Sequence, residues 1–436
     1  MKKKLKVVEL FAGVGGFRLG LEGYKGLSSS SGYKEPIHSY YEVVWSNQYE
    51  PTSKKQWAAE IYSKQFGKQK KNFNVNIEEI NAKNIPYCDV LVGGFPCQDY
   101  SVANSLRTAK GILGKKGILW WQIERIISKK QKKPKYLILE NVDRLLKSPV
   151  YQKGRDFAVM LASLNNLGYV VEWRIINAAD FGFPQKRRRV FILAYLGTKN
   201  KNIFDYQFKA SEIKSEFTFD IKESLQNLSK KFGKGDRISK FLNSGVCIDK
   251  KVTSMSLKYE IPKKPTLLKN ILIKESSHID DEFWIHEKVL PKWQEGKNAR
   301  SINRISMRDG KPFNYKFSEG SMSFPDKLDS PARTIITSEG GNAPARNKHI
   351  IKHRRLYLPN WLEELLLALK IISNKRVYRR LTALELERLN MFPNNHTKIE
   401  NITNSKRAFL MGNALVVGVV ERIGACIKEN ERNIQS

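Results

Sequence analysis

The chain has 436 residues, 77 of them lysine or arginine and 43 aspartate or glutamate, which gives a formal net charge of +34 at pH 7. This length favours two to three domains, or one large core with an appended lobe. The charge favours a polyanionic partner, either nucleic acid or an anionic membrane surface, although a lysine-rich composition contributes to it.

The cysteines and the N-terminal segment indicate the compartment. Four cysteines in a chain of this length, without a secretory signal, do not make a disulfide framework. No apolar run approaches the ~20 residues needed to span a bilayer, so we expect no membrane partner. Cys88, Cys247 and Cys426 lack the spacing of zinc ligands, so we expect no metal. We therefore expect a reduced protein in the cytoplasm.

The first 22 residues have the pattern of a strand, a glycine turn and a helix. The strand is predicted at residues 6–11, the turn at 12–16 and the helix from 17 to 22, which is the opening of a nucleotide-type Rossmann unit. Arg18 stands where the third glycine of a G-x-G-x-x-G motif would be, which argues against a pyrophosphate ligand. The turn still suits a nucleoside cofactor without phosphates, because its first two glycines let the backbone approach the ligand.

A second strand is predicted at residues 41–47, after a Ser/Gly-rich insert at 25–36. A ribose-binding acid is expected at the end of such a strand, but Gln48 occupies that place. Residues 75–77 precede another loop. The glycine turn and the end of this second strand are therefore the candidate cofactor site.

A third strand, at residues 89–92, runs into Gly93-Gly94-Phe95-Pro96-Cys97-Gln98. Two glycines and a proline force a tight turn, at the end of a strand where open α/β sheets place their ligands. Cys97 is either a small buried residue or a nucleophile. The Gly-Gly-Phe-Pro frame, and the polar residues that follow, favour the nucleophile.

Two further polar groups stand at the ends of strands. The predicted strand at 135–139 ends in Glu140, and Arg187 and Arg189 precede a strand at 190–194. Between Cys97 and these strands the pattern predicts a polar loop at 104–116, helices at 118–127 and 157–167, and a strand at 170–176. A thiol, an acid and a guanidinium on one rim of a sheet, beside a nucleoside pocket, point to a catalytic site.

The alternation of strands and helices ends near residue 198. Residues 198–330 are lysine-rich and irregular, which predicts a second lobe. Regular patterns return at 331–337 and in a helix at 385–389, and a final apolar helix is predicted from Met411 to about Lys428.

Taken in order, these segments resemble the DNA (cytosine-5)-methyltransferases, over roughly residues 1–197 and 331–428. The resemblance implies an α/β fold with a Rossmann-like S-adenosylmethionine-dependent methyltransferase core and a second, smaller, irregular DNA-recognition domain. The segments that carry it are Phe11-Ala12-Gly13-Val14-Gly15-Gly16, Gly94-Phe95-Pro96-Cys97-Gln98, Glu140-Asn141-Val142, Gln185-Lys186-Arg187-Arg188-Arg189, Arg380-Leu381-Thr382 with Glu385, Arg388-Leu389 and Phe392-Pro393, and Gly412-Asn413-Ala414-Leu415-Val416.

The resemblance also implies a division of the chain. Residues 1–197 would form the catalytic and cofactor-binding domain, and 198–330 the target-recognition region. Residues 331–404 would complete the small domain and its connection, and 405–436 would form a C-terminal helix that returns to the catalytic domain.

The resemblance assigns a role to each polar group at the rim. Cys97 would add as a thiolate to C6 of cytosine, which makes C5 nucleophilic. Glu140 would hold the exocyclic amine and N3, and Arg189 would contact the O2 edge. Arg187 would support the site or contact phosphate. The target base would leave the duplex to reach the thiol, and residues 101–117 resemble the loop that closes over DNA in this family.

The implied methyl donor is S-adenosylmethionine. The resemblance places Phe11 against its adenine, Gly13 and Gly15 at close backbone approach, and Asn413 near its methionine end. Gln48 and Asn76 stand where Glu and Asp are commoner in the family, and both can accept a hydrogen bond through the amide oxygen. Tyr49, Ile77, Gly94 and Pro96 complete the expected cofactor site.

The implied function is site-specific methylation of double-stranded DNA by a monomer that protects host DNA in a restriction–modification system, with a cognate endonuclease only as a functional partner. One alternative is a transfer-RNA methyltransferase, since one branch with these motifs acts on RNA; the large basic middle region favours DNA. The other is a non-catalytic DNA-binding relative, which the complete set of Cys97, Glu140 and Arg189 opposes.

The recognition sequence is not determined by these residues. The runs at 338–342 and 46–48 resemble a branch that acts on GGNCC-like sites. Thr266-Leu267 resembles a Thr-Leu pair in the recognition region of many relatives, or equally an ordinary helix start.

Overall fold

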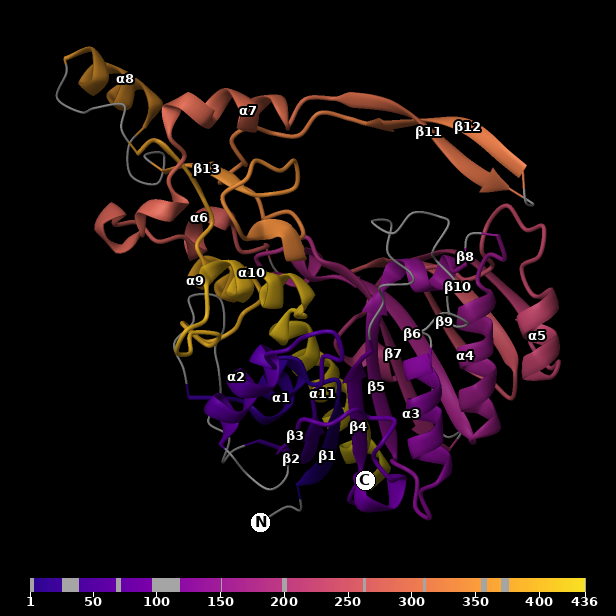
Figure 1. The fold of residues 1–436 in the computed structure, drawn as a ribbon. Coiled ribbons are helices and arrows are strands. Elements are labelled where there is room, and N and C mark those ends of the chain that lie inside the picture. Colours follow the sequence, from indigo (N-terminus) through magenta and orange to yellow (C-terminus); the bar gives the residue numbers. More distant parts are fainter. Residues whose placement is uncertain are drawn as a thin grey trace.

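The computed structural model describes residues 4–25, 39–67, 72–95, 118–149, 151–197, 202–261, 264–308, 311–353, 359–369 and 376–435. A ten-stranded sheet forms the centre of the molecule, in the order β3-β2-β1-β4-β5-β7-β6-β9-β10-β8. A small lobe stands above it in Figure 1. We use "small lobe" for residues 264–353 with helix α8 and strand β14.

Half of the sheet is parallel. Its strands are β3 (Asn72–Phe73), β2 (Tyr41–Asn47), β1 (Leu5–Leu10), β4 (Val90–Gly94) and β5 (Tyr136–Val142). Parallel strands covered on both faces read as continuous apolar runs. In β1, for example, neighbouring Val7 and Val8 are both fully buried and belong to cores on opposite faces. This half confirms the predicted Rossmann-like α/β core.

The other half is antiparallel. It contains β7 (Arg188–Leu196), β6 (Tyr169–Asn177), β9 (Ser244–Ile248), β10 (Lys251–Tyr259) and β8 (Ala210–Asp220). The prediction of an irregular lobe from residue 198 is therefore wrong for residues 210–259, which extend the main sheet. The edge strand β8 exposes nine of its eleven residues, and its apolar face, with Ile213, Phe217 and Phe219, is interrupted by Ser211 and Ser215.

Helices cover both faces of the sheet (Figure 1). The core on one face is built with α1 (Gly16–Glu22), α2 (Trp57–Phe66) and α11 (Val417–Gln435). The core on the other face is built with α3 (Ile118–Ser128), α4 (Arg155–Asn166) and α5 (Leu225–Lys231). The sheet is thus the middle of three layers, and its strand ends are left open to the small lobe.

The C-terminal region differs from its prediction. Instead of one helix from Met411, α10 (Asn404–Asn413) ends before α11 begins, and the Val417 N–H donates to the Asn390 carbonyl at 3.0 Å across the break. The helical stretch Asn404–Ile434 is long and apolar enough to cross a membrane by its length and composition. No apolar run of this length was expected from the sequence. However, 72% of the most apolar window of this stretch is buried inside the protein, as in a core helix.

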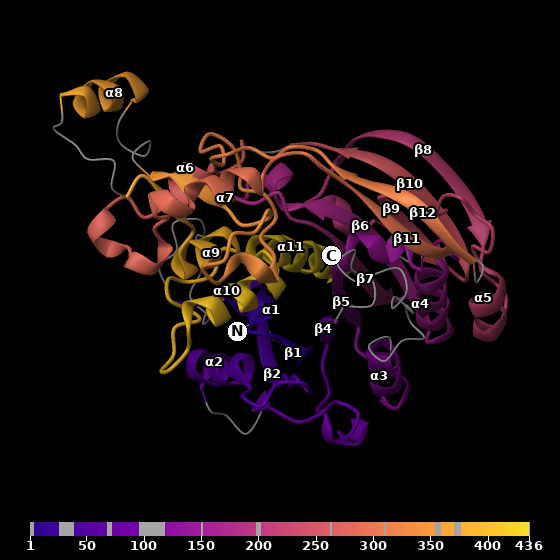
Figure 2. The same ribbon diagram turned by 45° about the horizontal axis from the view of Figure 1, so that its top comes forward.

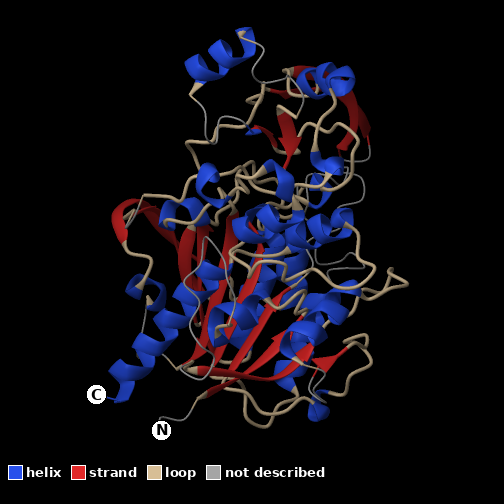
Figure 3. Ribbon diagram, turned by 90° about the vertical axis from the view of Figure 1, so that its left-hand side faces the viewer, coloured by secondary structure: helices blue, strands red, loops and turns tan. Residues whose placement is uncertain are grey.

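The small lobe lies beyond α9 (Ala383–Leu389) and α10, as Figures 2 and 3 show. Its elements are α6 (Leu268–Ile271), α7 (Leu290–Glu295), β11 (Arg300–Arg308), β12 (Lys311–Glu319), β13 (Ile350–Lys352), α8 (Asn360–Ala368) and β14 (Tyr378–Arg380). A separate cluster of buried apolar residues in it contains only Ile285, Trp293 and Ile350. A partly buried ion pair, Arg333 with Asp326 at 2.7 Å, supplements this small core.

Thr266 and Leu267 conform to the ordinary helix start. The Thr266 hydroxyl donates to the Gly182 carbonyl at 2.9 Å, and α6 begins directly after Leu267. Thr266 therefore joins the small lobe to the loop between β6 and β7.

Candidate active site

The candidate site lies at the carboxyl ends of β1, β4 and β5. β1 pairs with β2 on one side and β4 on the other, so the chain order of the sheet reverses there. Open α/β sheets bind their ligands at such a topological switch point. The predicted cofactor and catalytic residues follow these strands directly.

The glycine turn after β1 has an unusual backbone. Phe11, Gly13 and Gly15 all have positive φ, at 53°, 56° and 89°. A Cβ at Gly15 would lie 2.3 Å from the Phe66 ring, so packing against α2 explains that glycine. A Cβ at Gly13 would meet nothing within 4 Å, so Gly13 is the position that leaves open space for a ligand.

Gln48 is joined to this turn. Its Oε1 accepts a hydrogen bond from the Gly13 N–H at 2.7 Å. The atom expected to accept from a ribose hydroxyl therefore already holds the glycine turn against the end of β2. Tyr49, the next residue, is 39% exposed.

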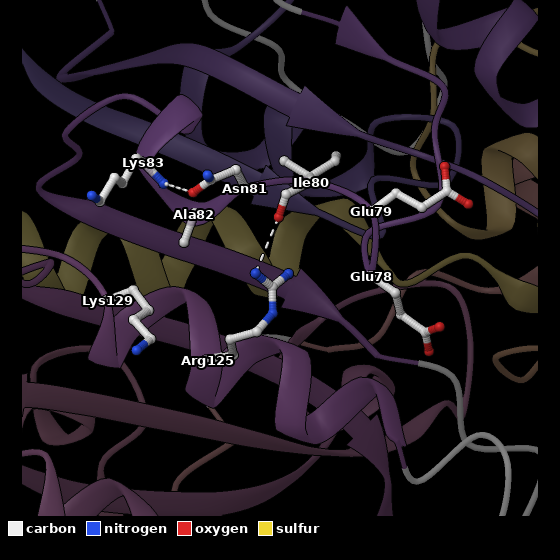
Figure 4. Close-up of a pocket in the computed structure, with 8 residues that line it drawn as sticks. All are labelled: Glu78, Glu79, Ile80, Asn81, Ala82, Lys83, Arg125 and Lys129. Carbon is white, nitrogen blue, oxygen red and sulfur yellow. Dashed lines mark hydrogen bonds between the residues drawn. The ribbon is translucent and has the colours of Figure 1, made fainter.

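The loop that contains Asn76 and Ile77 is held in place by hydrogen bonds from Arg125 of α3. Asn76 Oδ1 accepts from the Glu78 N–H at 3.2 Å, and Ile77 is buried. Arg125 donates to the Ile77 carbonyl at 2.9 Å. It also donates to the Ile80 carbonyl at 3.1 Å, as Figure 4 shows. The pocket under the loop in Figure 4 is lined by Glu78, Glu79, Ile80, Asn81, Ala82, Lys83, Arg125 and Lys129.

The ends of β4 and β5 bring Gly94 and Glu140 together. They are register partners in the parallel ladder, and a Cβ at Gly94 would lie 3.3 Å from Glu140 Oε2. Phe95 packs its ring against Trp120, 5.7 Å between centroids. Pro96 and Cys97 lie outside the described residues. Glu140 therefore stands beside the residue three positions before Cys97.

Glu140 forms an ion pair with Arg189 of β7. Arg189 Nε lies 3.0 Å from Glu140 Oε1, and the two side chains are only 17% and 13% exposed. Burial raises the pKa of Glu140, although Arg189 and Arg187 both oppose this shift. A carboxyl group whose pKa is raised can donate a hydrogen bond as well as accept one. The sequence prediction that Glu140 and Arg189 lie at one rim is therefore consistent with this geometry.

Arg187 has a supporting position. It is 2% exposed and donates to the carbonyls of Ile335 at 3.0 Å and Gly412 at 2.9 Å. Of its two predicted roles, its burial favours support of the site over contact with phosphate. Arg187 joins the β6–β7 connection to the small lobe and to α10.

Two buried amide side chains, Asn141 and Gln185, belong to the sequence motifs, but sequence analysis assigned them no role. Asn141 Nδ2 donates to the Phe95 carbonyl at 3.2 Å, which holds the chain just before Pro96 and Cys97. Gln185 Oε1 accepts from the Ile335 N–H at 3.0 Å, and its Nε2 donates to Asn390 Oδ1 at 2.9 Å. Their place in the motifs was the only sequence signal, because a buried amide leaves no periodic pattern.

The remaining predicted site residue, Asn413, is the last residue of α10 and is exposed. In the part of the chain that the structure describes, no group of three or more His, Cys, Asp or Glu residues could hold a metal ion. The candidate site thus contains the Glu140–Arg189 ion pair and the glycine turn, which leaves open space at Gly13. It also contains the chain segment that leads to Cys97.

Similarity to known proteins extends over nearly the whole chain. The model of the C-5 cytosine-specific DNA methylase family matches residues 5–429. The chain is 40% identical to the Type II methyltransferase M.Sau3AI of Staphylococcus aureus, over 98% of this chain and 96% of that protein. It is 33% identical to the Type II methyltransferase M.HhaI of Haemophilus parahaemolyticus over 47% of this chain and 52% of that protein.

Solved structures agree with the fold. A methyltransferase of Entamoeba histolytica, EhMeth, aligns over 99% of both chains with a TM-score of 0.60 and 18% identity. The Dnmt2 methyltransferase of S. pombe aligns over 98% of this chain and 99% of its own, with a TM-score of 0.57 and 18% identity. With the family match, this extent of similarity shows that the chain belongs to the C-5 cytosine-specific DNA methylase family and is a DNA (cytosine-5)-methyltransferase.

Proposed function

We propose that this protein transfers a methyl group from S-adenosylmethionine to C5 of a cytosine that has left the DNA duplex, through a covalent bond between Cys97 and C6. The observation that carries this proposal is the Glu140–Arg189 ion pair beside Gly94, at the end of the strand that leads to Cys97. This pair offers a hydrogen-bonding edge for one pyrimidine.

The chemistry follows from these groups. The Cys97 thiolate adds to C6, and Glu140 gives a hydrogen bond or proton at N3, so that the C5=C6 electron pair becomes available at C5. Arg189 contacts O2, where negative charge develops. After C5 has taken the methyl group, N3 returns its proton to Glu140 and a solvent base removes the C5 proton. The electron pair of the C5–H bond then re-forms the double bond and expels the thiolate.

The residues of the first strands fit an adenosyl cofactor without phosphates. Gly13 leaves open space, and Gln48 is bonded to it through its amide oxygen. Asn76 adds a second amide on the loop that follows β3. S-adenosylmethionine would supply the electrophilic methyl group there. Phe11, Gly13, Gly15, Gln48, Tyr49, Asn76, Ile77, Gly94, Pro96 and Asn413 are the residues proposed to surround it.

The biological role that we propose is protection of host DNA in a restriction–modification system, by a monomer that acts on double-stranded DNA in the cytoplasm. The name of M.Sau3AI as a Type II methyltransferase supports this role. Sequence choice is assigned to residues 198–330, and within this range the residues from 264 onward stand apart from the main sheet.

The covalent step can be tested with DNA that contains 5-fluorocytosine. Fluorine at C5 cannot leave as a proton does, so the enzyme with S-adenosylmethionine should form a complex with this DNA that resists denaturation. Cys97→Ala should abolish it, while Cys88→Ala, Cys247→Ala and Cys426→Ala should not, since these three thiols are buried.

A trapped complex with the Cys97→Ala variant would show that another residue is the nucleophile. The same assay with transfer RNA distinguishes the alternative substrate. Trapping on RNA and not on duplex DNA would overturn the choice of DNA.

A further inference from the structure

The small lobe extends a long two-stranded ribbon, the β11–β12 hairpin. Its two strands pair in antiparallel register without interruption from Arg300–Glu319 to Arg308–Lys311. In Figures 1 and 2 it leaves the lobe beside α7 and extends over the side of the sheet that carries β9, β10 and β8. Strands of nine residues reach ~30 Å, close to one turn of duplex DNA.

The hairpin does not contribute to a hydrophobic core. None of its described side chains belongs to the three apolar clusters, and Ile305 is 74% exposed. An isolated two-stranded hairpin is marginally stable in water. A hairpin that projects from the lobe without a core therefore adds little to the stability of the fold. This indicates that its surface serves to contact another molecule.

The base of the hairpin is nevertheless held firmly. Arg346 donates to the carbonyls of Gly296 at 3.3 Å, Asn298 at 2.5 Å and Gly320, so it joins both strands to the lobe. Lys297, which is buried, donates to the carbonyl of Arg346 at 2.6 Å. The ribbon consequently has a fixed direction relative to the lobe.

The two faces of the ribbon differ in chemistry. On one face the groups are paired with each other: Arg300 lies 2.5 Å from Glu319, and Arg304 lies 4.2 Å from the centre of the Phe317 ring. On the other face Asn303 stands opposite Lys316, and Ile305 opposite Asn314. These four side chains are exposed, and no hydrogen bond or ion pair to any of them is found among the described residues.

We propose that this second face of the β11–β12 hairpin lies in the major groove of the substrate DNA and reads base edges with Asn303, Asn314 and Lys316. The inference rests on the proposed action on duplex DNA. The major groove admits a two-stranded ribbon; Asn pairs with adenine, Lys with guanine, and an apolar side chain such as Ile305 contacts the thymine methyl group.

Charge supports DNA as the occupant. Residues 300–319 contain five basic and two acidic residues. On the first face Arg300 and Arg304 are engaged, whereas the second face combines a lysine with amides that have no partner among the described residues. This combination suits hydrogen bonding to bases more than a purely electrostatic contact.

The test is the site preference of a double variant, Asn303→Ala with Lys316→Ala, on a duplex library of random sequence. Each enzyme methylates the library with S-adenosylmethionine, and bisulfite sequencing identifies the methylated sites. The variant should lose about tenfold to a hundredfold in kcat/KM at the preferred site and accept other bases at one or two positions. Asn314→Ala should relax a different position.

A matched control removes one amide and one lysine at the opposite end of β5, with Gln131→Ala and Lys132→Ala, both exposed. The control should stay within twofold at every site. An unchanged Tm of the hairpin variants verifies that they fold, as expected for exposed side chains without partners.

Two results would overturn the inference. One is an unchanged site preference and rate in both hairpin variants. The other is a uniform loss across all sequences with a salt slope that falls by about one, since this indicates a phosphate contact. If the unaltered protein methylates no DNA at all, it is the proposed function that fails.

Discussion

The end of β5 and the β11–β12 hairpin are two polar surfaces built in opposite ways. At the end of β5, Glu140 and Arg189 are mostly buried, and Arg187 behind them is 2% exposed and bonded to two carbonyls. On the hairpin, Asn303 and Lys316 are exposed and lack intramolecular partners in the described chain. The fold thus fixes the residues assigned to chemistry, whereas those assigned to sequence reading can change at little cost in stability.

The largest expected effect is on catalysis at the buried pair. Glu140→Gln keeps the shape of the side chain but cannot provide a carboxylic proton, so kcat should fall by about 10²–10⁴. Methyl transfer to duplex DNA under single-turnover conditions measures this step. S-adenosylmethionine affinity serves as the control and should be retained. A variant within threefold of normal activity would contradict the role of Glu140.

Arg187 and Arg189 should differ in their contributions to the free energy of unfolding. Arg187→Ala leaves the carbonyls of Ile335 and Gly412 without their buried donor, which should lower the free energy of unfolding by about 2–4 kcal/mol. Arg189→Ala removes a partly exposed partner and should cost less than about 1.5 kcal/mol while it reduces activity strongly. Urea unfolding of both variants gives the two values. Equal losses of stability would remove the distinction between them.

The smallest expected effect concerns the cofactor site. Gln48→Ala removes the 2.7 Å bond to Gly13, and Asn76→Ala removes the bond to Glu78 together with the proposed ligand contact. One hydrogen bond typically contributes about 0.5–1.5 kcal/mol, so each change should weaken S-adenosylmethionine binding roughly threefold to tenfold. Calorimetric titration measures this, and normal affinity in both variants would remove these residues from the site.

The parallel half of the sheet was predictable from sequence because its strands are continuous apolar runs that end in glycine or polar motifs. β1, β4 and β5 lie within one residue of their predicted starts, and the rim position of Glu140 follows from them. The same reasoning could not assign Gln185 or Asn141, because their partners, Asn390 and Phe95, come from other parts of the chain.

The antiparallel strands β8, β9 and β10 were missed for a different physical reason, whereas β6 and β7 were predicted. In β8, Ile213, Phe217 and Phe219 lie on one face, but the serines at 211 and 215 on the same face weaken the apolar alternation on which strand prediction depends.

A turn signal was present for the hairpin, since Asp309-Gly310 is a favoured hairpin dipeptide. In β12, Phe313, Tyr315 and Phe317 alternate as in a strand, but the matching face of β11 carries Arg300, Arg304 and Arg308, which weakens the apolar signal.

The pairing of α1 with α11 bears on how the protein is made. Tyr41, next to α1 on the same face, donates its hydroxyl to the Gly424 carbonyl at 2.6 Å, and a Cβ at Gly20 would lie 2.7 Å from Val420. The helix α1 is therefore synthesised before its partner α11. The interval between the synthesis of the two helices is on the order of 20–80 s at ordinary rates of translation. During that time the apolar surface of α1 has no native partner, so nascent chains of this enzyme are expected to depend on chaperones.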